Sequence, residues 1–231
     1  MKFKRVWAIS DVHGNHDLLK SLIENSIRFD PRTDLLILLG DYIDRSDESK
    51  EVVSYLSELR KANPDNVVLL MGNHEEMAFK YFTLGKNPTE TELLEANMWL
   101  ANGGTETIKS FGSEQEAKRV LMPFIQSLLP FYETDTHIFV HGGIRHDCSD
   151  ITTDLSEILW YRPDHCAPYN GKVQIVGHTI CQDVCQIGSV CFIDTGAFYH
   201  GKLSALEVNS GQVLCVKKKV PNRLSLLFEG V

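Results

Sequence analysis

The sequence predicts an α/β protein, a two-sheet β-sandwich flanked by helices, and three observations indicate this fold class. Apolar, β-branched runs alternate with helical patterns from Val6 to Met71. From His137 onward, strand-like runs follow one another with few helical patterns between them. The 231 residues are 43% hydrophobic and 23% charged, which is typical of a soluble globular protein with one substantial core. We therefore expect a single domain over residues 1–231.

Three strands joined by two helices are expected first. The strand-like runs cover residues 6–10, 35–39 and 67–71, and the helical patterns cover 17–27 and 48–61. A β-α-β-α-β order implies right-handed crossovers and neighbouring, largely parallel strands. Since open parallel sheets bind ligands beyond the carboxyl ends of their strands, the residues just after each run are the first candidates for function.

A helical insertion is expected at about 77–130. Helical patterns cover residues 77–84, 90–101, 106–111 and 114–128, with glycine and proline residues as punctuation. The apolar spacing in these segments is typical of scaffold helices. Trp99, Asn102 and Arg119 are the residues of the insertion that could line a substrate cleft.

A second sheet is expected in the C-terminal part of the chain. Strand-like runs cover residues 137–140, 173–176, 190–194, 203–208 and 213–216. The last two runs are bridged by Asn209-Ser210-Gly211-Gln212, a sequence typical of a hairpin turn. Together with the first sheet, these strands complete the two-sheet sandwich.

Composition and charge exclude several classes of function. The net charge is -8, and the only lysine cluster is Lys217-Lys218-Lys219, so nucleic acid is not expected as a partner. No apolar run reaches the roughly 18 residues of a membrane helix or forms a signal peptide, so we expect a cytoplasmic protein without membrane contact. The six cysteines form no Cys-x-x-Cys pair and are interpreted as free thiols. The sequence does not indicate an oligomeric state.

Five short motifs follow the strand-like runs and carry candidate metal ligands. The motifs are Asp11-Val12-His13-Gly14-Asn15, Gly40-Asp41-Tyr42-Ile43-Asp44-Arg45, Gly72-Asn73-His74-Glu75, Val140-His141-Gly142-Gly143 and Gly177-His178-Thr179. Three imidazoles, two carboxylates and one amide oxygen form the ligand set: His13, His141, His178, Asp11, Asp41 and Asn73. Manganese, iron or zinc accepts these donors, which include no thiolate. We expect two divalent metal ions.

The spacing of the motifs suggests how the ligands divide between the two ions. Asp11 and His13 lie two positions apart at a strand end, so both can point to one side of the chain and share an ion. An ionised carboxylate at Asp41, after a fully apolar run, needs a cation or several hydrogen-bond donors nearby, and Asp41 is the natural bridge between two ions. Asn73, His141 and His178 would then complete the second ion.

This arrangement predicts hydrolysis of a phosphate ester. Two neighbouring ions can hold a hydroxide and clamp phosphoryl oxygens for in-line attack. His74 is the candidate general acid for the leaving alkoxide, and Asp44 could orient its imidazole. Arg45 offers a planar fork to two phosphate oxygens, and Arg162 could offer a second one.

The motifs resemble those of the metallo-dependent phosphoprotein phosphatases, especially the small bacterial and phage serine/threonine phosphatases. The resemblance covers residues 6–200 and implies a calcineurin-like, four-layer α/β/β/α fold. It implies a dinuclear, usually manganese-activated enzyme that removes phosphate from a phosphoprotein or phosphopeptide, at serine or threonine, with tyrosine as a further option. In this family pattern the six ligands divide as above, with His74 and Asp44 as the acid dyad and Arg45 and Arg162 as phosphate clamps.

The sequence departs from the family pattern at two positions, and two alternative functions stay open. Ser10 and Ser46 stand where family members usually have glycine, and Ser46 would be strained if its position requires a positive φ. Symmetrical dinucleoside tetraphosphate hydrolases share the metal loops, but their motif typically reads Gly-Asn-His-Asp, whereas this chain has Glu75 at the last position. A non-catalytic metal-binding or phosphate-binding module is the other alternative, although such a module would not need His74.

Overall fold

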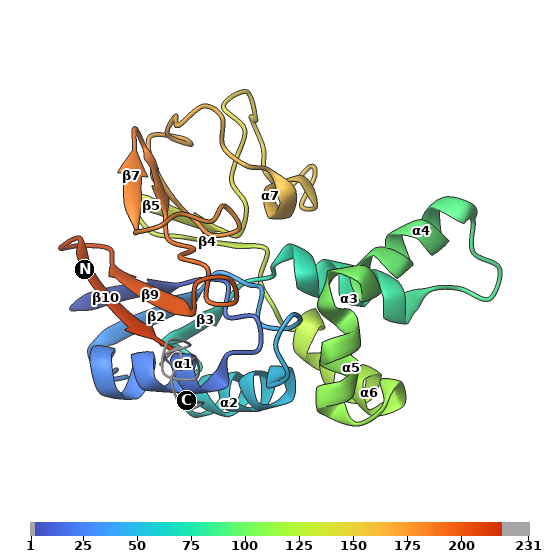
Figure 1. Ribbon diagram of the computed structural model, residues 1–231. Helices are drawn as coiled ribbons and strands as arrows, with labels where there is room; N and C mark the ends of the chain where they lie inside the picture. Colours follow the sequence, from blue (N-terminus) through green and yellow to red (C-terminus); the bar gives the residue numbers. More distant parts are fainter. Residues whose placement is uncertain (1–2, 219–231) are drawn as a thin grey trace, which may run out of the picture.

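The computed structural model describes residues 3–218, which form two five-stranded β-sheets packed face to face (Figure 1). Helices cover the outer face of the first sheet, and a long loop segment with one short helix covers the outer face of the second. The predicted fold class is confirmed. Residues 1–2 and 219–231, which include Lys219 of the lysine cluster, lie outside the described residues.

Each sheet contains three adjacent parallel strands and two antiparallel strands. The first sheet has the order β10-β9-β1-β2-β3 and the second β4-β5-β6-β8-β7. The strands of the first sheet are β1 (Arg5–Ile9), β2 (Asp34–Leu38), β3 (Val67–Leu69), β9 (Lys202–Glu207) and β10 (Gln212–Lys217). Those of the second are β4 (Phe131–Glu133), β5 (His137–Val140), β6 (Val173–Val176), β7 (Cys185–Ile187) and β8 (Val190–Phe192). The parallel strands are β1, β2 and β3 in the first sheet and β5, β6 and β8 in the second.

The predicted hairpin is present, but it was assigned to the wrong sheet: β9 pairs antiparallel with β1, so the hairpin extends the first sheet and not the second. Strands β9 and β10 pair antiparallel, with Glu207 opposite Gln212. Two strands were not predicted. The edge strands β4 and β7 have three residues each, too few to show a period-2 pattern, and all three residues of β7 are exposed.

Side-chain alternation along the strands builds the core on both faces of the first sheet. Val6 and Ala8 of β1 pack against the second sheet, whereas Trp7 and Ile9 point to the helices. The outer face of the second sheet is covered by the segment from Ile144 to Tyr169, which forms a third apolar cluster.

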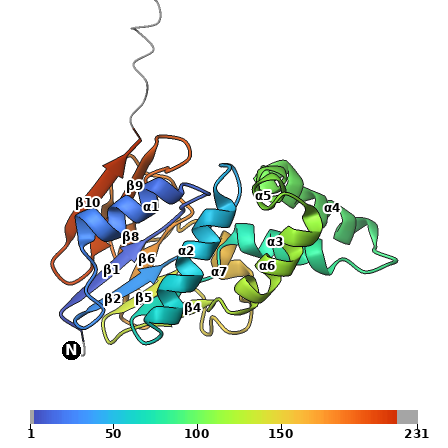
Figure 2. The ribbon, with the colours of Figure 1, turned by 90° about the horizontal axis from the view of Figure 1, so that it is seen from below.

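Two groups of helices surround the sheets. Helices α1 (His16–Lys20), its π-helical continuation η1 (Ser21–Ile27), and α2 (Ser49–Ala62) cover the first sheet, as the view in Figure 2 shows. A second group stands beside the sheets and includes α3 (Asn73–Thr83), α4 (Glu90–Trp99), the π-helical turn η2 (Leu100–Gly104), α5 (Thr105–Phe111) and α6 (Glu114–Gln126). The short helix α7 (Glu157–Trp160) lies over the second sheet. Helix α3 begins at Asn73 rather than at the predicted residue 77, because Gly72 is extended and ends the preceding segment.

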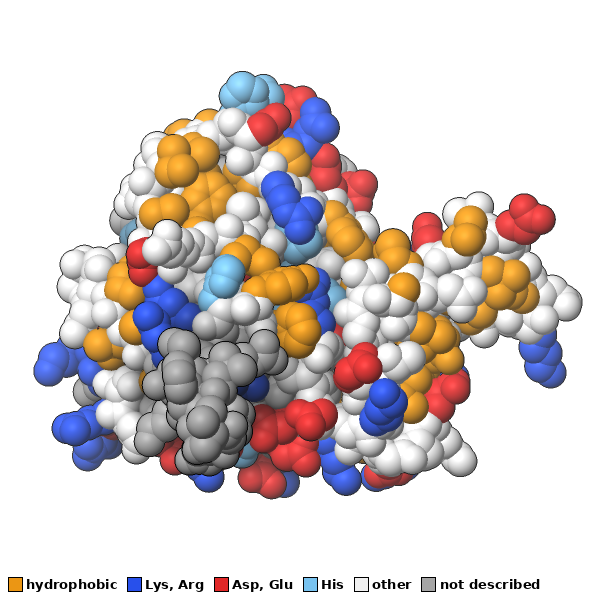
Figure 3. All heavy atoms as spheres, in the orientation of Figure 1, with side chains coloured by type: hydrophobic (Ala, Val, Ile, Leu, Met, Phe, Trp, Pro, Cys, Tyr) orange, Lys and Arg blue, Asp and Glu red, His pale blue; other side chains and the backbone are white. Residues whose placement is uncertain are grey.

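Helix α4 projects away from the rest of the molecule. Figure 3 shows hydrophobic side chains on this projecting arm, where Leu93, Leu94 and Met98 are exposed. Among residues 3–218, no helix is both long enough and apolar enough to cross a membrane.

Candidate metal centre and active site

Each of the six parallel strands is followed, within one to four residues, by a polar side chain at one common site. The residues after β1, β2 and β3 are Asp11, Asp41 and Asn73, and those after β5, β6 and β8 are His141, His178 and Asp194. All six side chains are buried. Sequence reasoning identified five of them and missed Asp194, although it follows an apolar strand in the same way as Asp41.

Backbone strain is concentrated at this site. Eight described non-glycine residues have a positive φ, and six of them belong to the predicted site: Asp11 (54°), His13 (46°), Asp41 (55°), Asp44 (73°), Arg45 (69°) and His178 (57°). Such conformations cost on the order of 1–3 kcal/mol each and persist only where the surroundings enforce them. The site is therefore held in shape by the rest of the fold.

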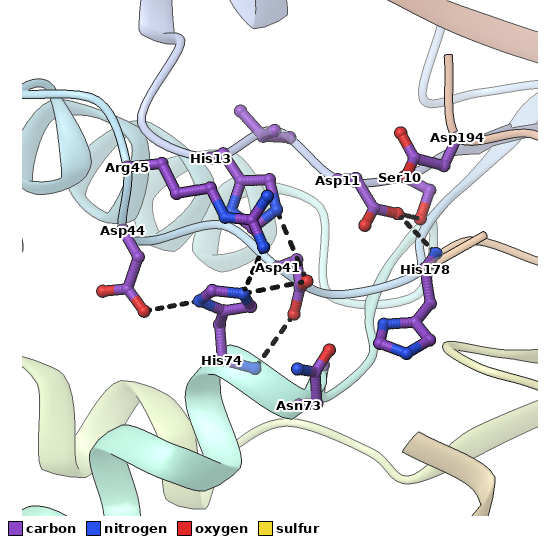
Figure 4. Close-up of polar contacts among 12 residues, drawn as sticks. Ser10, Asp11, His13, Asp41, Asp44, Arg45, Asn73, His74, His178 and Asp194 are labelled. Carbon is purple, nitrogen blue, oxygen red and sulfur yellow. Dashed lines mark hydrogen bonds and ion pairs between the residues drawn. The ribbon is translucent and has the colours of Figure 1, made fainter. Parts of the chain in front are cut away.

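The two serines that replace glycine have different surroundings. Ser46 does not have a positive φ; the left-handed conformation falls on Asp44 and Arg45, and the Ser46 N–H donates to the Asp44 carbonyl at 2.8 Å. Ser46 therefore carries none of the strain considered for it. Ser10 is buried, and its hydroxyl donates to the Asp11 carboxylate (Figure 4).

Two imidazoles are anchored so that their Nε2 atoms face Asp41. His13 Nδ1 lies 2.9 Å from the Ile43 carbonyl, and His141 Nδ1 lies 2.9 Å from the Leu39 carbonyl. Because a carbonyl only accepts, each Nδ1 carries the proton. The Nε2 atoms then lie 3.5 Å (His13) and 3.4 Å (His141) from the two carboxylate oxygens of Asp41. Asp41 thus stands between the two halves of the site.

The donor atoms fit divalent metal ions. His141 Nε2 lies 2.9 Å from Asn73 Oδ1, and the buried Nε2 of His178 has no hydrogen-bond partner. Lone pairs that face one another without a donor between them call for a cation. The ligand atoms of Asp41, His141 and His178 lie within 4.8 Å of one another, as do those of His13, Asp41 and His74. These distances suit two ions that share Asp41.

Burial and the local charges favour the metal-binding forms of His13, His178 and Asp41, whereas His141 differs. Burial lowers the pKa values of His13 and His178 to about 3, so both imidazoles stay neutral. Although burial opposes it, the imidazoles of His141 and His74 hold the pKa of Asp41 well below its ordinary value. His141 shows the reverse: against the effect of burial, Asp41 raises its pKa to about 9. The carboxylate of Asp41 thus favours a positive charge at this position, which either a proton on His141 or a metal ion can supply.

Asp11 reaches the site through a different set of contacts. It belongs to neither trio of ligand atoms; its carboxylate accepts from the Ser10 hydroxyl and, at 3.0 Å, from the His178 N–H. It nevertheless lines the same cavity as His13 and Asp41. Asp11 is therefore buried on the wall that His13 and Asp41 share, and its assignment to the first ion stays a prediction.

The predicted acid dyad is assembled beside the metal cluster. His74 Nδ1 lies 2.6 Å from Asp44 Oδ2, and both side chains are buried (Figure 4). The backbone N–H of His74, in the first turn of α3, donates to Asp41 Oδ1 at 3.0 Å. Arg45 Nη2 lies 3.2 Å from His74 Nε2, and Arg45 Nη1 donates to the Tyr199 hydroxyl at 2.7 Å. Since arginine only donates, His74 Nε2 accepts here and its proton is on Nδ1.

Both predicted clamp arginines line one small cavity. The cavity has a volume of about 110 Å³, and Arg45 and Arg162 lie on it together with the metal-ligand side chains. Phe198 and Tyr199 form part of its wall, and Arg45 lies over the Tyr199 ring at 5.1 Å. The loop that carries these two aromatic residues was not predicted, since nothing in its sequence marks it as facing a site on another strand.

Glu75 has a structural role that its sequence motif did not reveal. It is fully buried, and its carboxylate accepts from the backbone N–H groups of Asp41, Tyr42 and Gly72 at 2.8 to 3.0 Å. Glu75 therefore fixes the backbone of the Asp41 loop against the start of α3 and does not line the cavity.

The family of the chain follows from comparison with known proteins. The profile of the calcineurin-like phosphoesterases matches residues 4–193. The chain belongs to the calcineurin-like phosphoesterases. This phosphoesterase is 31% identical over 222 residues to serine/threonine-protein phosphatase 2 of Escherichia coli, a match that covers 89% of this chain and 94% of the relative. The family and this relative identify the chain as a phosphoester hydrolase, as predicted.

Two further similarities place this calcineurin-like phosphoesterase among its relatives. It is 24% identical to the asymmetrical bis(5′-nucleosyl)-tetraphosphatase of Bacillus subtilis, with 92% of this chain and 94% of the relative covered. A solved serine/threonine phosphatase of Saccharomyces cerevisiae shares the fold with a TM-score of 0.68 at 15% identity, covering 96% of this chain and 82% of that chain.

Proposed function

We propose that this protein is a manganese-dependent phosphatase that hydrolyses phosphoserine and phosphothreonine in proteins. The observation that carries the proposal is the cavity of about 110 Å³ that Arg45 and Arg162 line together with the metal-ligand side chains. A cavity of this size admits a small polar group such as a phosphoryl group. The similarity to serine/threonine-protein phosphatase 2 over nearly the full length of both chains supports a phosphoprotein substrate.

The residues of the cluster would hold two ions. Asp11, His13 and Asp41 are assigned to one ion, and the ligands of the other are Asp41, Asn73, His141 and His178. When bound, divalent ions supply a water of lowered pKa and neutralise phosphoryl oxygens. Manganese is proposed because the donors are nitrogen and oxygen without a thiolate; iron and zinc accept the same donors.

The remaining residues position the substrate and move a proton. The guanidinium groups of Arg45 and Arg162 bind non-bridging phosphoryl oxygens. When Arg45 turns toward the phosphoryl group, it leaves His74 Nε2, which can then carry a proton for the leaving oxygen of serine or threonine. Asp44 holds the Nδ1–H of His74 and stabilises the protonated ring.

Hydrolysis of a dinucleoside tetraphosphate is the second candidate. The similarity to the tetraphosphatase of Bacillus subtilis along nearly the whole chain favours it, although that relative is named asymmetrical and the sequence motifs had suggested the symmetrical type. Glu75, the residue that separated the two functions in the sequence, contacts backbone N–H groups and not the cavity, so it does not read the substrate directly. The two candidates must therefore be separated by experiment.

The experiment compares substrates on metal-stripped protein to which Mn²⁺ is returned. Phosphate release is measured from phosphoserine, phosphothreonine and phosphotyrosine peptides, and cleavage of diadenosine tetraphosphate is measured in parallel. Asp41→Asn protein serves as the blank. Peptide turnover that is absent from the blank supports the phosphoprotein phosphatase. Nucleotide cleavage without peptide turnover supports the second candidate, and inactivity on all substrates would indicate a binding module without turnover.

A further inference from the structure

The helical segment beside the sheets reaches the acid dyad through two buried side chains. Trp99, at the end of α4, is fully buried, and its Nε1–H lies 3.0 Å from each carboxylate oxygen of Asp44. The Thr107 hydroxyl in α5 donates to Asp44 Oδ1 at 2.7 Å. Together with His74, these two residues give the Asp44 carboxylate its side-chain hydrogen bonds. The sequence had suggested Trp99 as a residue of the cleft wall, but its side chain lies behind the dyad.

Thr107 also fixes the backbone of Asp44. Its hydroxyl oxygen accepts from the Asp44 N–H at 2.9 Å, and the Ser49 hydroxyl lies 3.1 Å from both that N–H and the Thr107 hydroxyl. One hydroxyl therefore binds both the main chain and the carboxylate of Asp44. This double contact supports the left-handed conformation of Asp44, which has a φ of 73°.

Two glycines between Trp99 and Thr107 allow the segment to approach the site closely. A Cβ atom on Gly103, which has a φ of +110°, would lie 2.4 Å from the Arg45 backbone nitrogen. A Cβ atom on Gly104 would lie 2.5 Å from the Trp99 ring. Neither position has room for a side chain. The two glycines thus allow the turn to pack closely against both the Trp99 ring and the Arg45 backbone.

We propose that Trp99 and Thr107 are positioning residues of the reaction, which keep the Asp44 carboxylate aimed at His74 Nδ1. A fully buried carboxylate with only one partner could rotate away from His74, and it would lose the charge-assisted hydrogen bonds that compensate its burial. The helical insertion is therefore part of the catalytic architecture and not only a scaffold. This inference rests on the proposed function in one respect, because it assumes phosphate-ester hydrolysis with His74 as the acid.

The test uses the dependence of the rate on the leaving group. Trp99→Phe keeps a buried ring and removes the N–H; Thr107→Val removes the hydroxyl and Thr107→Ser retains it. For a simple alkyl phosphate monoester, whose leaving oxygen needs a proton, we expect kcat to fall roughly 10- to 100-fold in Trp99→Phe and Thr107→Val. For 4-nitrophenyl phosphate, whose leaving group needs little protonation, we expect kcat to stay within about 3-fold of the original, since acid catalysis contributes little there. KM and Mn²⁺ content should not change, and Thr107→Ser should retain most of the rate.

Trp7→Phe is the matched control for the loss of an indole N–H. Trp7 is also buried, but its Nε1 has no hydrogen-bond partner, so this variant should keep the rates on both substrates. An equal loss on both esters, a loss of Mn²⁺, or unchanged rates in Trp99→Phe would each overturn the inference.

A double variant checks that Trp99 acts through Asp44. In an Asp44→Asn background, Trp99→Phe should cause little additional loss on the alkyl ester, because the group it positions is already altered. Losses that multiply would contradict the inference. If the unaltered protein hydrolyses both simple esters but no phosphopeptide, the proposed protein substrate fails while the test of Trp99 and Thr107 still stands.

Discussion

Each of the two sheets presents the ends of three parallel strands to the site, yet the two sheets contribute different numbers and kinds of functional side chains. Each strand end of the second sheet carries one functional candidate, namely His141, His178 or Asp194. Each strand end of the first sheet carries at least two, and the sets are Asp11 with His13, Asp41 with Asp44 and Arg45, and Asn73 with His74. The metal cluster is thus shared between the sheets, whereas the acid dyad comes from the first sheet alone.

The backbone explains the difference. After β1 and β2, five residues with positive φ turn successive side chains toward the site, and after β3 the first turn of α3 presents Asn73 and His74 together. In the second sheet, only His178 among the three strand-end residues has a positive φ. Multiple functions at one strand end therefore require a strained turn or a helix start, which the first sheet provides.

The largest effect is expected from Asp41→Asn, because Asp41 stands between the two imidazole groups. We expect loss of both Mn²⁺ ions and a fall in kcat on the order of 10³-fold or more, since the charge that binds the metal is removed. Asp194→Asn is the counterpart in the second sheet. Asp194 belongs to neither trio of ligand atoms, and an asparagine at this position can still accept from the Gly196 backbone N–H, so we expect less than about a 10-fold change. Metal analysis with kinetics checks both, and similar effects of the two changes would break the comparison.

His74→Asn separates acid catalysis from metal binding. We expect kcat to fall about 10²–10⁴-fold while the Mn²⁺ content is retained, because His74 donates a proton and its neighbour Asn73 is the ligand. In the second sheet, His141→Asn should lose metal instead. Because the Nε2 of His74 lies 3.9 Å from Asp41 Oδ2, loss of metal from His74→Asn would make His74 a ligand and refute this assignment.

The two clamp arginines provide a comparison with a smaller expected effect. Lysine cannot replace the planar fork of arginine, so Arg45→Lys and Arg162→Lys should both raise KM for a phosphopeptide, by roughly 10-fold. Only Arg45→Lys should also lower kcat, because Arg45 alone contacts His74. Steady-state kinetics would show this, and equal effects on kcat would count against a special role for the first sheet.

Metal removal should lower stability, because ligand binding helps to hold the strained turns. A metal at 100 times its Kd stabilises the folded protein by about 2.7 kcal/mol. We expect chelation to lower Tm by several degrees and returned Mn²⁺ to restore it, as measured by calorimetry. An unchanged Tm in the protein that binds Mn²⁺ would show that the fold alone maintains the site.

The smallest effect concerns a buried carboxylate at the opposite end of β2. Asp34 accepts from Arg5 Nε at 2.9 Å and from the Asp30 N–H at 2.9 Å. Burial works against ionisation, but the Arg5 guanidinium outweighs it and lowers the pKa of Asp34 below its ordinary value. A lowered pKa stabilises the folded protein above the ordinary pKa of the group, and this contribution is lost as the pH falls through the lowered value.

Asp34→Asn should therefore reduce the free energy of unfolding by about 1–3 kcal/mol at pH 7 and by less in acid. Denaturant titrations at both pH values measure this difference. The hydrolysis rate of Asp34→Asn should not change. This variant is therefore a control for Asp41→Asn, because it shows that removing a buried charge elsewhere on β2 does not by itself abolish activity. A difference that grows in acid would contradict a lowered pKa for Asp34.

The sequence by itself determined the fold class and the chemical type of the site. Strand periodicity and motif order placed Asp11, Asp41, Asn73, His141 and His178 at strand ends, because side-chain alternation and the β-α-β connection are local properties of the chain. The dyad of His74 and Asp44 could be predicted for the same reason, since each of the two residues belongs to one of these motifs. Asp194 carried the same signal and was overlooked.

Only the tertiary structure decided which side chains support the site. Trp99 lies 55 positions from Asp44, and Tyr199 lies 154 positions from Arg45, so no local pattern relates them. The backbone-binding role of Glu75 and the strain at Asp44 and Arg45 instead of Ser46 also depend on how the loops pack. Ligand types are fixed by residue chemistry, whereas supporting contacts depend on which distant surfaces the fold brings together.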